Sequence, residues 1–485
     1  MDLHRVAGAA SAMAVDVLII GSGEAGVPLA VRLANSGRQV ALVERAFFGG
    51  TCANYGCTPT KTMVASARAA HVARTAARLG VRTGGVQVDF AAVVARKDSM
   101  VRRWRERAAR RLQGPGERLR VIEGPARFVG DREVDVAGRR YRGDVVIINT
   151  GARPAVPAIP GLEAVPWVDN HRVMDLEELP RHLVVLGGGY IGCEFGQMFR
   201  RFGSAVTIIE RHDHLLAHED ADISTSLEQV FRGEGIDLRR EARVERVARA
   251  GDDIVVHLGR QEVRSSHLLV AVGRRANTDD LGCDAAGIAI DRRGYVIVDD
   301  RYRTSAPGVF AVGDVAGGPQ FTHSSWDDHR LLFDILLGRA TRGRADRIVP
   351  STVFTDPQVA HVGLRESEAR ARGMNVEVAG MPFADIARAI ETDETAGLMK
   401  LIIDPSDERI LGVTLVGADA GELIHIFIPL IAARASARSI VDAEFIHPTF
   451  AEGVQALVMS LPRYALDFWF VQRQTGRDGQ LAHVR

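Results

Sequence analysis

The stretch that decides the fold is VDVLIIGSGEAGVPLAVRLANSGRQVALVE, residues 15–44. Its first six residues are a short apolar run that stops at glycine, which is typical of a buried strand. GSGEAG follows and places Gly21, Gly23 and Gly26 in the spacing G-x-G-x-x-G, ahead of an apolar helix pattern. A second strand, QVALVE, ends in Glu44. This order predicts a dinucleotide-binding unit, with phosphates at the helix N-terminus and Glu44 on a ribose.

The same pattern returns later in the chain. LVVL (183–186) reads as a strand and runs into GGGYIG, and a further strand, AVTIIE, ends in Glu210. The glycines of this second turn are Gly187, Gly189 and Gly192. Two such units predict two bound dinucleotides, or one internal duplication. Two bound cofactors would suit electron transfer between them.

The residues that end the second unit bear on the choice of nicotinamide. Glu210 favours a free ribose 2′-hydroxyl and hence NADH, whereas Arg211 and His212, which follow at once, would suit the 2′-phosphate of NADPH. Because a carboxylate repels a phosphate, the sequence favours NADH over NADPH.

Composition narrows the class of protein. A chain of 485 residues predicts several domains. Lys+Arg and Asp+Glu both number 61, so the charge balance gives no support for a nucleic-acid or membrane-surface partner. The sequence contains no run of 18 apolar residues, so we expect no transmembrane helix. Four cysteines are too few for a secreted disulfide framework. We expect residues 1–14 to be a loose extension and the protein to be cytoplasmic.

Scarce residues collect in GGTCANYGCTPTK, residues 49–61. The segment holds Cys52, Cys57 and Lys61, one of only three lysines among 61 basic residues. The cysteine pair predicts a redox pair or a buried apolar pair. A zinc site would need further ligands, and Cys193 and Cys283 lack the spacing, so we expect no metal site and interpret both as ordinary thiols.

Five motifs follow one another along the chain: GSGEAG, GGTCANYGCTPTK, GGGYIGCEF, VFAVGDV and HPTFAEG. Together they resemble the FAD-dependent pyridine nucleotide–disulfide oxidoreductases of class I, the branch of lipoamide dehydrogenase, glutathione reductase and mercuric reductase. The resemblance implies an α/β fold with two Rossmann-like dinucleotide-binding domains and an α+β C-terminal dimerisation domain. It implies, in chain order, an extension (1–14), a first FAD-binding part (15–154), an NAD(P)-binding domain (155–277), a second FAD-binding part (278–348), the dimerisation domain (349–475) and a tail (476–485).

The resemblance also assigns roles to the scarce residues. Cys52 and Cys57 would form a redox-active disulfide against the flavin, with Cys57 as the flavin-side thiolate and Cys52 as the thiol that meets the substrate. Lys61 would lie near the flavin, paired with Glu194. Tyr190 would be a lid over the flavin; the alternative is an aromatic ring that only packs on the turn.

A late motif implies a shared active site. By resemblance, His447 and Glu452 of HPTFAE form an acid–base pair that reaches the disulfide of the other subunit of a homodimer. The apolar stretch 423–433 is consistent with an interface helix or with core inside its own domain.

Further cofactor contacts follow from the same resemblance. Gly313 and Asp314 end a predicted strand, and an acid there suits a polyol chain, although alone it would be an ordinary turn residue. The full implied set is Gly21, Gly23, Gly26, Glu44, Gly50, Thr51, Lys61, Thr150, Gly151, Gly313 and Asp314 for FAD, and Gly187, Gly189, Gly192, Glu210, Arg211 and Gly273 for NAD(P).

The predicted function is electron transfer from NAD(P)H through FAD to the Cys52–Cys57 disulfide and on to a disulfide substrate, or the reverse from a dithiol. One alternative is a metal-ion reductase, but no cysteine follows Cys283, and mercuric reductases usually have tyrosine where His447 stands. Another is a lipoamide dehydrogenase that serves as a subunit of a multienzyme complex. The arginines of VRRWRERAARR (101–111) would steer an anionic substrate or, as we favour, form a solvated helix face.

Overall fold

The structure is a computed structural model and describes residues 12–464. Contacts divide the chain into two compact units. Unit 1 comprises the chain up to Ala70, Gln87–Arg211 and Ala242–Arg347; unit 2 comprises His71–Val86, His212–Glu241 and the chain from Ile348. The tail expected at 476–485 lies outside the described residues. The extension expected at 1–14 is wrong at its end, because Met13 and Ala14 pair with strand β6 and belong to strand β1.

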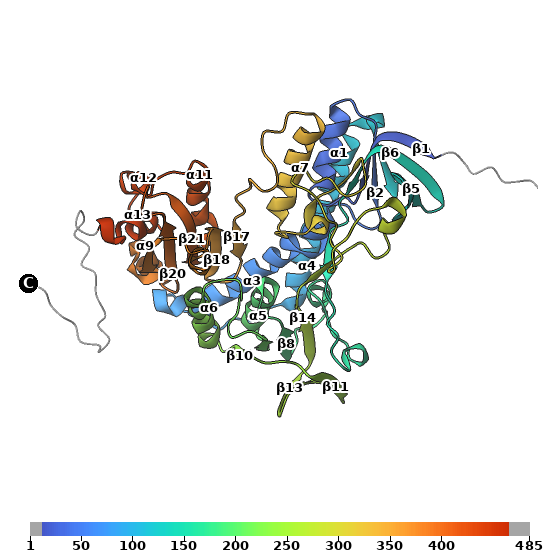
Figure 1. Cartoon of the computed structure of the whole chain (residues 1–485). Helices are drawn as coiled ribbons and strands as arrows, with labels where there is room; N and C mark the ends of the chain where they lie inside the picture. The colour runs from blue at the N-terminus through green and yellow to red at the C-terminus, as the bar shows by residue number, and fades with distance from the viewer. Residues whose placement is uncertain (1–11, 465–485) are drawn as a thin grey trace, which may run out of the picture. The chain divides into compact units, whose positions relative to one another are not determined.

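A seven-stranded sheet of unit 1 carries the first glycine turn (Figure 1). Its order is β3-β2-β1-β6-β5-β4, and β16 pairs with β6. Strands β2, β1, β6 and β16 run parallel to one another, so their carboxyl ends meet at one edge of the sheet, whereas β5 is antiparallel to β6. The strands are β1 (Met13–Ile20), β2 (Val40–Glu44), β3 (Leu119–Glu123), β4 (Ala126–Gly130), β5 (Glu133–Val136), β6 (Arg139–Ile148) and β16 (Val309–Ala311). The strand predicted at 15–20 is confirmed, and its last four residues are buried.

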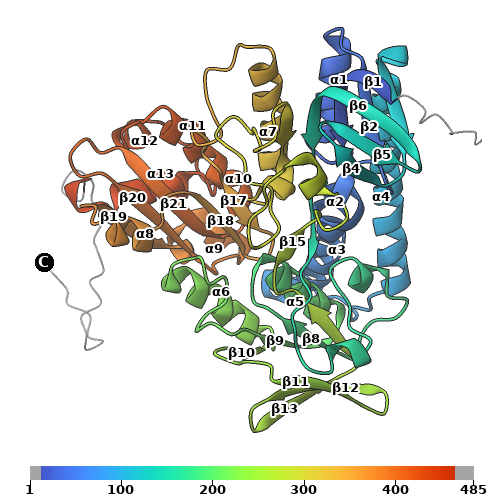
Figure 2. The same ribbon diagram turned by 45° about the vertical axis from the view of Figure 1, so that its right-hand side comes forward.

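A second parallel sheet of unit 1 repeats the arrangement around β8, which pairs with β9 and β14. The predicted strand at 183–186 is confirmed and is fully buried. An antiparallel meander, β11-β12-β13, extends this part of the chain (Figure 2). A short antiparallel pair, β7 with β15, joins the segments that enter and leave it. The strands are β7 (Ala152–Pro154), β8 (His182–Leu186), β9 (Ala205–Ile209), β11 (Arg246–Ala250), β12 (Asp253–Leu258), β13 (Gln261–Ser265), β14 (His267–Val270) and β15 (Arg274–Ala276).

The helices of unit 1 follow the glycine turns and the cysteines. They are α1 (Gly26–Asn35), α2 (Gly50–Tyr55), α3 (Cys57–Thr75, which runs on into unit 2), α4 (Phe90–Gln113), α5 (Tyr190–Phe202) and α7 (Thr322–Leu336). Helix α4 is amphipathic: Val101 and Leu112 are buried, whereas Arg102, Arg103 and Arg107 are exposed. This pattern agrees with the solvated face that we favoured for residues 101–111.

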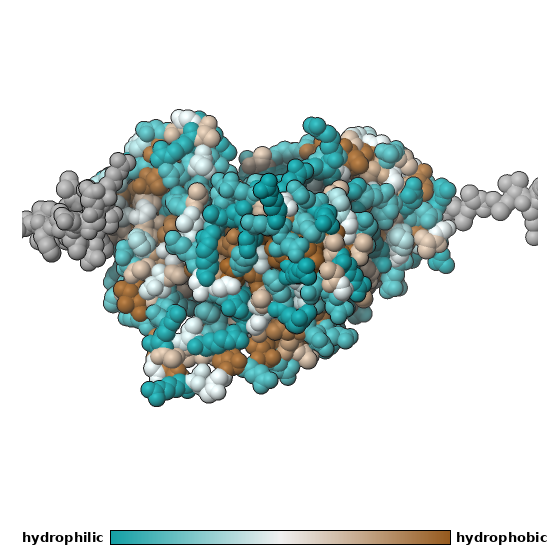
Figure 3. All heavy atoms as spheres, turned by 90° about the horizontal axis from the view of Figure 1, so that it is seen from below, coloured by the Kyte–Doolittle hydropathy of each residue, from teal (hydrophilic) through white to brown (hydrophobic). Residues whose placement is uncertain are grey.

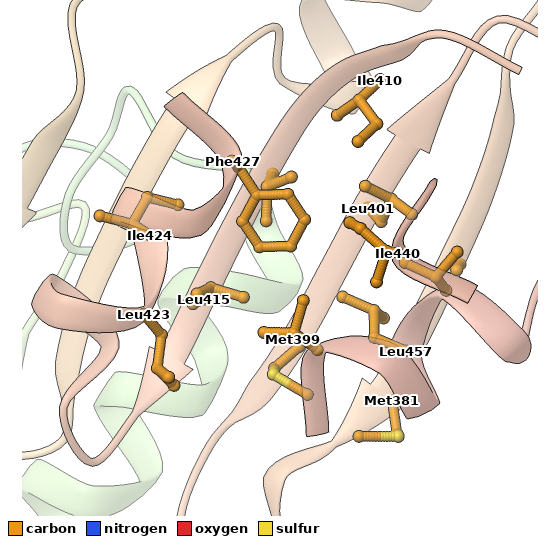
Figure 4. Packing of buried hydrophobic residues seen from close by; sticks show 14 of the residues in the cluster. Met381, Met399, Leu401, Ile410, Leu415, Leu423, Ile424, Phe427, Ile440 and Leu457 are labelled. Carbon is orange, nitrogen blue, oxygen red and sulfur yellow. The ribbon is translucent and has the colours of Figure 1, made fainter. Parts of the chain in front are cut away.

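Unit 2 is built on a five-stranded antiparallel sheet of order β17-β18-β21-β20-β19. Its elements are α6 (Ala221–Gly233), β10 (Asp237–Arg239), β17 (Ser351–Val353), β18 (Gln358–Gly363), α8 (Glu366–Ala371), β19 (Glu377–Pro382), α9 (Ala387–Thr392), β20 (Leu398–Ile403), β21 (Ile410–Gly417), α10 (Ala420–Leu423), α11 (Phe427–Ala432), α12 (Arg438–Val441) and α13 (Glu452–Met459). Leu423, Ile424 and Phe427 pack into the core between helices and sheet (Figure 4). The apolar stretch 423–433 therefore contributes core inside its own unit.

No helix among residues 12–464 has the length and apolar character needed to cross a membrane. The face drawn in Figure 3 is mostly hydrophilic, and its apolar residues lie in small separate patches.

A buried lysine joins two segments of unit 2. The ammonium of Lys400 lies 3.2 Å from Asp220, 2.6 Å from Asp222 and 3.1 Å from Glu366, and the side chain is 7% exposed. Burial alone would lower the pKa of Lys400, but the carboxylates outweigh it and raise the pKa. The cluster ties the segment that begins α6 to β20 and α8.

Replacing Lys400 by methionine should destabilise the protein by about 3–5 kcal/mol, because it leaves the buried carboxylate of Asp220 without its counter-charge. The measurement is urea unfolding followed by circular dichroism. As a matched control, Arg388→Ala breaks an exposed ion pair with Glu391 and should cost less than about 1 kcal/mol. Equal, small losses in the two variants would contradict this role for Lys400.

Candidate active site

The first glycine turn is closed by close backbone contacts. Gly21 has φ +105°, and a Cβ atom there would lie 2.3 Å from the carbonyl oxygen of Asn149. A Cβ on Gly26 would lie 2.1 Å from the carbonyl oxygen of Gly21, so only glycine lets α1 pack this near the strand. The backbone N–H and hydroxyl of Ser22 both donate to Glu44 Oε2, at 2.9 and 2.6 Å. Glu44 therefore lies at the turn, and its contact with a ribose stays a prediction.

The second glycine turn repeats this construction. Gly187 has φ +103°, and a Cβ on Gly192 would lie 1.9 Å from the carbonyl oxygen of Gly187. The N–H of Gly188 donates to Glu210 Oε2 at 2.6 Å. A Cβ on Gly189 would meet nothing within 4 Å, so this side of the turn is open. In both turns, then, the acid that ends the second strand accepts a hydrogen bond from the residue after the first glycine.

Other predicted nicotinamide contacts lie around this turn. Arg211 follows Glu210 and is exposed. Gly273 has φ +126° and lies between β14 and β15. The roles of Glu210, Arg211 and Gly273 towards NAD(P) stay predictions.

The residues around the first turn fit a dinucleotide. A Cβ on Gly50 would lie 2.6 Å from the Cα of Gly23, and one on Gly313 would lie 2.9 Å from Asn149 Oδ1. Glycines thus let three separate segments approach one another closely and form a cradle at the first turn. Thr51 lies next to Gly50 in α2. The predicted FAD phosphates suit this cradle.

The predicted polyol contact is a buried acid. Burial raises the pKa of Asp314, and Arg274, whose Nη2 lies 3.4 Å from Asp314 Oδ2, opposes the shift. The adjoining crossing is fixed by reciprocal bonds: Thr150 donates through its hydroxyl to the carbonyl of Asn277 (2.9 Å), and Asn277 donates to the carbonyl of Thr150 (2.8 Å). Gly151 follows with φ +68°. These positions agree with an FAD site, and their individual contacts stay predictions.

The two cysteines differ in their electrostatics. Both are free thiols, and Cys57 opens the 19-residue helix α3. The hydrogen bond from the Cys52 thiol lowers the pKa of Cys57, helped by the charge of Lys61 and by the hydroxyl of Thr322, 3.1 Å from the Cys57 sulfur. The same bond, together with burial, raises the pKa of Cys52. This asymmetry supports Cys57 as the thiolate of the pair.

Lys61 and Glu194 form the predicted ion pair. The ammonium lies 2.9 Å from Oε1 and 2.7 Å from Oε2 of Glu194, whose side chain is 5% exposed. The pair joins α3 to α5. At the start of α5, the ring of Tyr190 stacks on Phe321 with centroids 6.0 Å apart. That contact is the packing expected in the alternative to a lid, and the lid role stays a prediction.

His447 and Glu452 lie in unit 2 and also pair as predicted. His447 Nδ1 is 2.8 Å from Glu452 Oε2, and the histidine side chain is 71% exposed. The pair is therefore displayed on the surface of its unit, and its contact with another subunit stays a prediction.

Several residues around the cysteines are not predicted by the sequence. Thr322 lies 265 positions from Cys57, and Arg105 donates to Asn54 Oδ1 at 2.5 Å. Asn170 donates to the carbonyl of Tyr55 at 2.8 Å. No local spacing marks these residues; the only signal for Thr322 is its place between the VFAVGDV motif and the next helix pattern.

The remaining thiols and the search for metal ligands add little chemistry. Cys193 and Cys283 are buried, and burial raises the pKa of Cys283 to about 11. Over residues 12–464, no three His, Cys, Asp or Glu side chains gather in a way that could hold a metal ion.

Comparisons with known proteins agree with this geometry. The model of the pyridine nucleotide-disulphide oxidoreductases matches residues 15–328, and that of their dimerisation domain matches residues 349–458. The probable pyridine nucleotide-disulfide oxidoreductase RclA of Escherichia coli is 38% identical over 91% of this chain and 98% of its own. A mercuric reductase of Lysinibacillus sphaericus is 33% identical over 94% and 83%. A solved Cu(II) complex of RclA, described as an HOCl-induced flavoprotein disulfide reductase, has TM-score 0.84 and 38% identity over 91% of this chain and 99% of its own.

Removing the hydroxyl of Thr322 should make the thiolate form of Cys57 less stable. A hydrogen bond to a charged group contributes about 1.5–3 kcal/mol, so Thr322→Val should raise the pKa of Cys57 by about 1–2 units. The lowered pKa of Cys57 in wild type keeps the thiolate present down to lower pH. Between the wild-type pKa and the higher pKa of the variant, Cys57 should therefore be mostly thiolate in wild type and mostly protonated in Thr322→Val. Ultraviolet thiolate absorbance of the reduced protein measures this, with Cys57→Ser as baseline. Thr322→Ser should behave as wild type, and an unchanged titration in Thr322→Val would refute the role.

Proposed function

Because the chain belongs to the pyridine nucleotide–disulfide oxidoreductases, we propose that Cys52 and Cys57 are its redox-active pair and that its substrate is a disulfide. Its cofactors are FAD and NAD(P)H, and its dimerisation domain supports a homodimer. The observation that carries the proposal is the electrostatic asymmetry of the two sulfurs, one favoured as thiolate and the other kept protonated.

The glycines of the first turn, with Gly50, Gly313 and Asp314, would hold FAD, which would supply the electron pair from the nicotinamide that reduces the Cys52–Cys57 disulfide. Cys57 is then left as a thiolate, held by the charge of Lys61 and the hydroxyl of Thr322. Cys52 gives its proton to His447 of the partner subunit and attacks one sulfur of the substrate disulfide to form a mixed disulfide, and His447 of the partner subunit returns this proton to the departing sulfur. Cys57 next attacks the Cys52 sulfur, which re-forms the protein disulfide and releases the second product as a thiolate that takes its proton from water. The substrate gains one electron pair and two protons.

Further details of the proposal rest on single features. NADH is the preferred nicotinamide, supported by Glu210 at the second turn. A cytoplasmic location is supported by the small number of cysteines, which is typical of proteins from a reducing compartment.

A second candidate function is reduction of a metal ion. It is favoured by one observation: relatives of this chain are described as a mercuric reductase and as a Cu(II) complex of a disulfide reductase. Against it, no cysteine follows Cys283 in this sequence. The disulfide remains the proposed substrate.

The decisive experiment compares acceptors. Holoenzyme reduced anaerobically by nicotinamide should pass electrons to disulfides, and His447→Ala should lose most of this turnover, by about 100-fold or more, because the leaving sulfur lacks its proton donor. Cys52→Ser should take up one electron pair fewer than wild type on full reduction and should not turn over disulfides. Oxidation by Hg²⁺ or Cu²⁺ alone, undiminished in His447→Ala, would instead favour the metal-ion reductase.

The choice of nicotinamide is tested by specificity. Because a 2′-phosphate would meet the carboxylate of Glu210, kcat/KM for NADH should exceed that for NADPH by about tenfold or more. Glu210→Gln removes the charge with little change of shape and should narrow the ratio. The matched change at the first turn, Glu44→Gln, should leave the ratio unaltered. A wild-type preference for NADPH would overturn this assignment.

A further inference from the structure

Residues 52–57, here named the redox loop, comprise the end of α2, Gly56 and the first residue of α3, and they contact a segment far along the chain. Tyr55 lies in this loop, three residues after Cys52 and two before Cys57. The amide of Asn170 donates to the Tyr55 carbonyl at 2.8 Å. The ring of His171 lies against the Tyr55 ring, with centroids 4.0 Å apart and planes inclined by 49°. Backbone and side chain of Tyr55 are thus held by adjacent residues.

The ring of His171 is itself fixed by charged groups. Its Nε2 lies 3.2 Å from Asp175 Oδ2, and Asp175 Oδ1 accepts a hydrogen bond from Lys97 at 2.5 Å. Lys97 is 4% exposed and also lies 2.7 Å from Asp98. The hydrogen bond from His171, followed by Lys97, lowers the pKa of Asp175 to about 2, so this carboxylate stays charged at neutral pH. The histidine ring is therefore fixed by a charged carboxylate that Lys97 itself holds in place.

The same segment reaches the cysteine helix and the second dinucleotide unit. Met174 accepts a hydrogen bond from Thr60, the residue before Lys61, at 3.7 Å. Val168 donates to the carbonyl of Leu268 in β14 and accepts from Val270, both at 2.8 Å. The eight residues 168–175 thus connect the sheet of β8, β9 and β14 to the redox loop.

We propose that His171 is a positioning residue for the cysteine pair: by holding Tyr55, it keeps the loop in the closed form in which the Cys52 and Cys57 sulfurs can bond to each other. The inference rests on the proposed function. A disulfide needs Cα atoms about 4.4–6.8 Å apart, and a loop held closed keeps the two sulfurs at high effective concentration. The clamp thereby favours the disulfide over the dithiol, and its release should make the pair easier to reduce.

Three substitutions separate the parts of the clamp. His171→Ala loses the ring and the bond to Asp175, His171→Gln keeps a polar group for Asp175 without the aromatic ring, and His171→Phe keeps an aromatic ring against Tyr55. Arg172→Ala, at the exposed next residue, is the matched control. Each holoenzyme is equilibrated in dithiothreitol redox buffers, quenched in acid and alkylated, and the oxidised fraction of the peptide that holds both cysteines is measured by mass spectrometry.

We expect wild type and Arg172→Ala to share one midpoint potential. His171→Ala and His171→Gln should shift the equilibrium about tenfold towards the dithiol, which is about 30 mV in the positive direction. His171→Phe should recover most of the wild-type value. If His171→Ala keeps the wild-type potential while the wild-type pair cycles, or if His171→Gln recovers it as well as His171→Phe does, the inference fails.

A second pair of variants guards against a loss of folding. Tyr55→Leu removes the other half of the contact and should give the same shift, and the double variant with His171→Ala should shift no further than either single one. Additive shifts would overturn the coupling between the two rings. A wild-type pair that shows no reversible change between thiols and disulfide would instead refute the proposed function itself, so the two failures are distinct.

Discussion

The ion pair of Lys61 and Glu194 is the constraint on which the rest of the electron path depends. Lys61 projects from the helix that carries the cysteines, and Glu194 from the helix that follows the second glycine turn. A carboxylate that is 5% exposed is costly without a counter-charge, so the two helices are held together by the penalty of separating them. The pair also places a cation beside Cys57, where it favours the thiolate. One ion pair therefore holds the cysteine helix against the helix of the second glycine turn and also stabilises the Cys57 thiolate.

The parts of the fold that the sequence predicts best are those fixed by local backbone geometry. Gly21 and Gly187 need positive φ and a close approach to a carbonyl, and only glycine meets both needs. Their spacing from Glu44 and Glu210 follows from one strand–helix–strand unit, so the sequence alone suffices to place both acids. Each acid holds its own turn through a backbone N–H, an interaction that the ribose hypothesis did not include.

The supports of the cysteine pair could not be predicted in the same way. Thr322, Asn170 and His171 approach the cysteines only because separate strands bring distant segments together. Their side chains are common in turns and helix starts, so nothing in their local sequence distinguishes a support from a surface residue. Lys97 is similar, because its rarity in the sequence carries no signal of its burial between two aspartates. Pairings within a motif, such as His447 with Glu452, were accessible because the two residues lie only five positions apart.

The engagement of all three lysines in ion pairs has a chemical consequence. All other residues among the 61 lysines and arginines are arginines, whose guanidinium groups hold their charge at any pH that the fold survives. Apart from its amino terminus, the folded chain offers acylating reagents and lysine-modifying enzymes three amines, and two of these are almost wholly buried. Acetylation of side-chain amines should therefore change the surface charge of this protein very little.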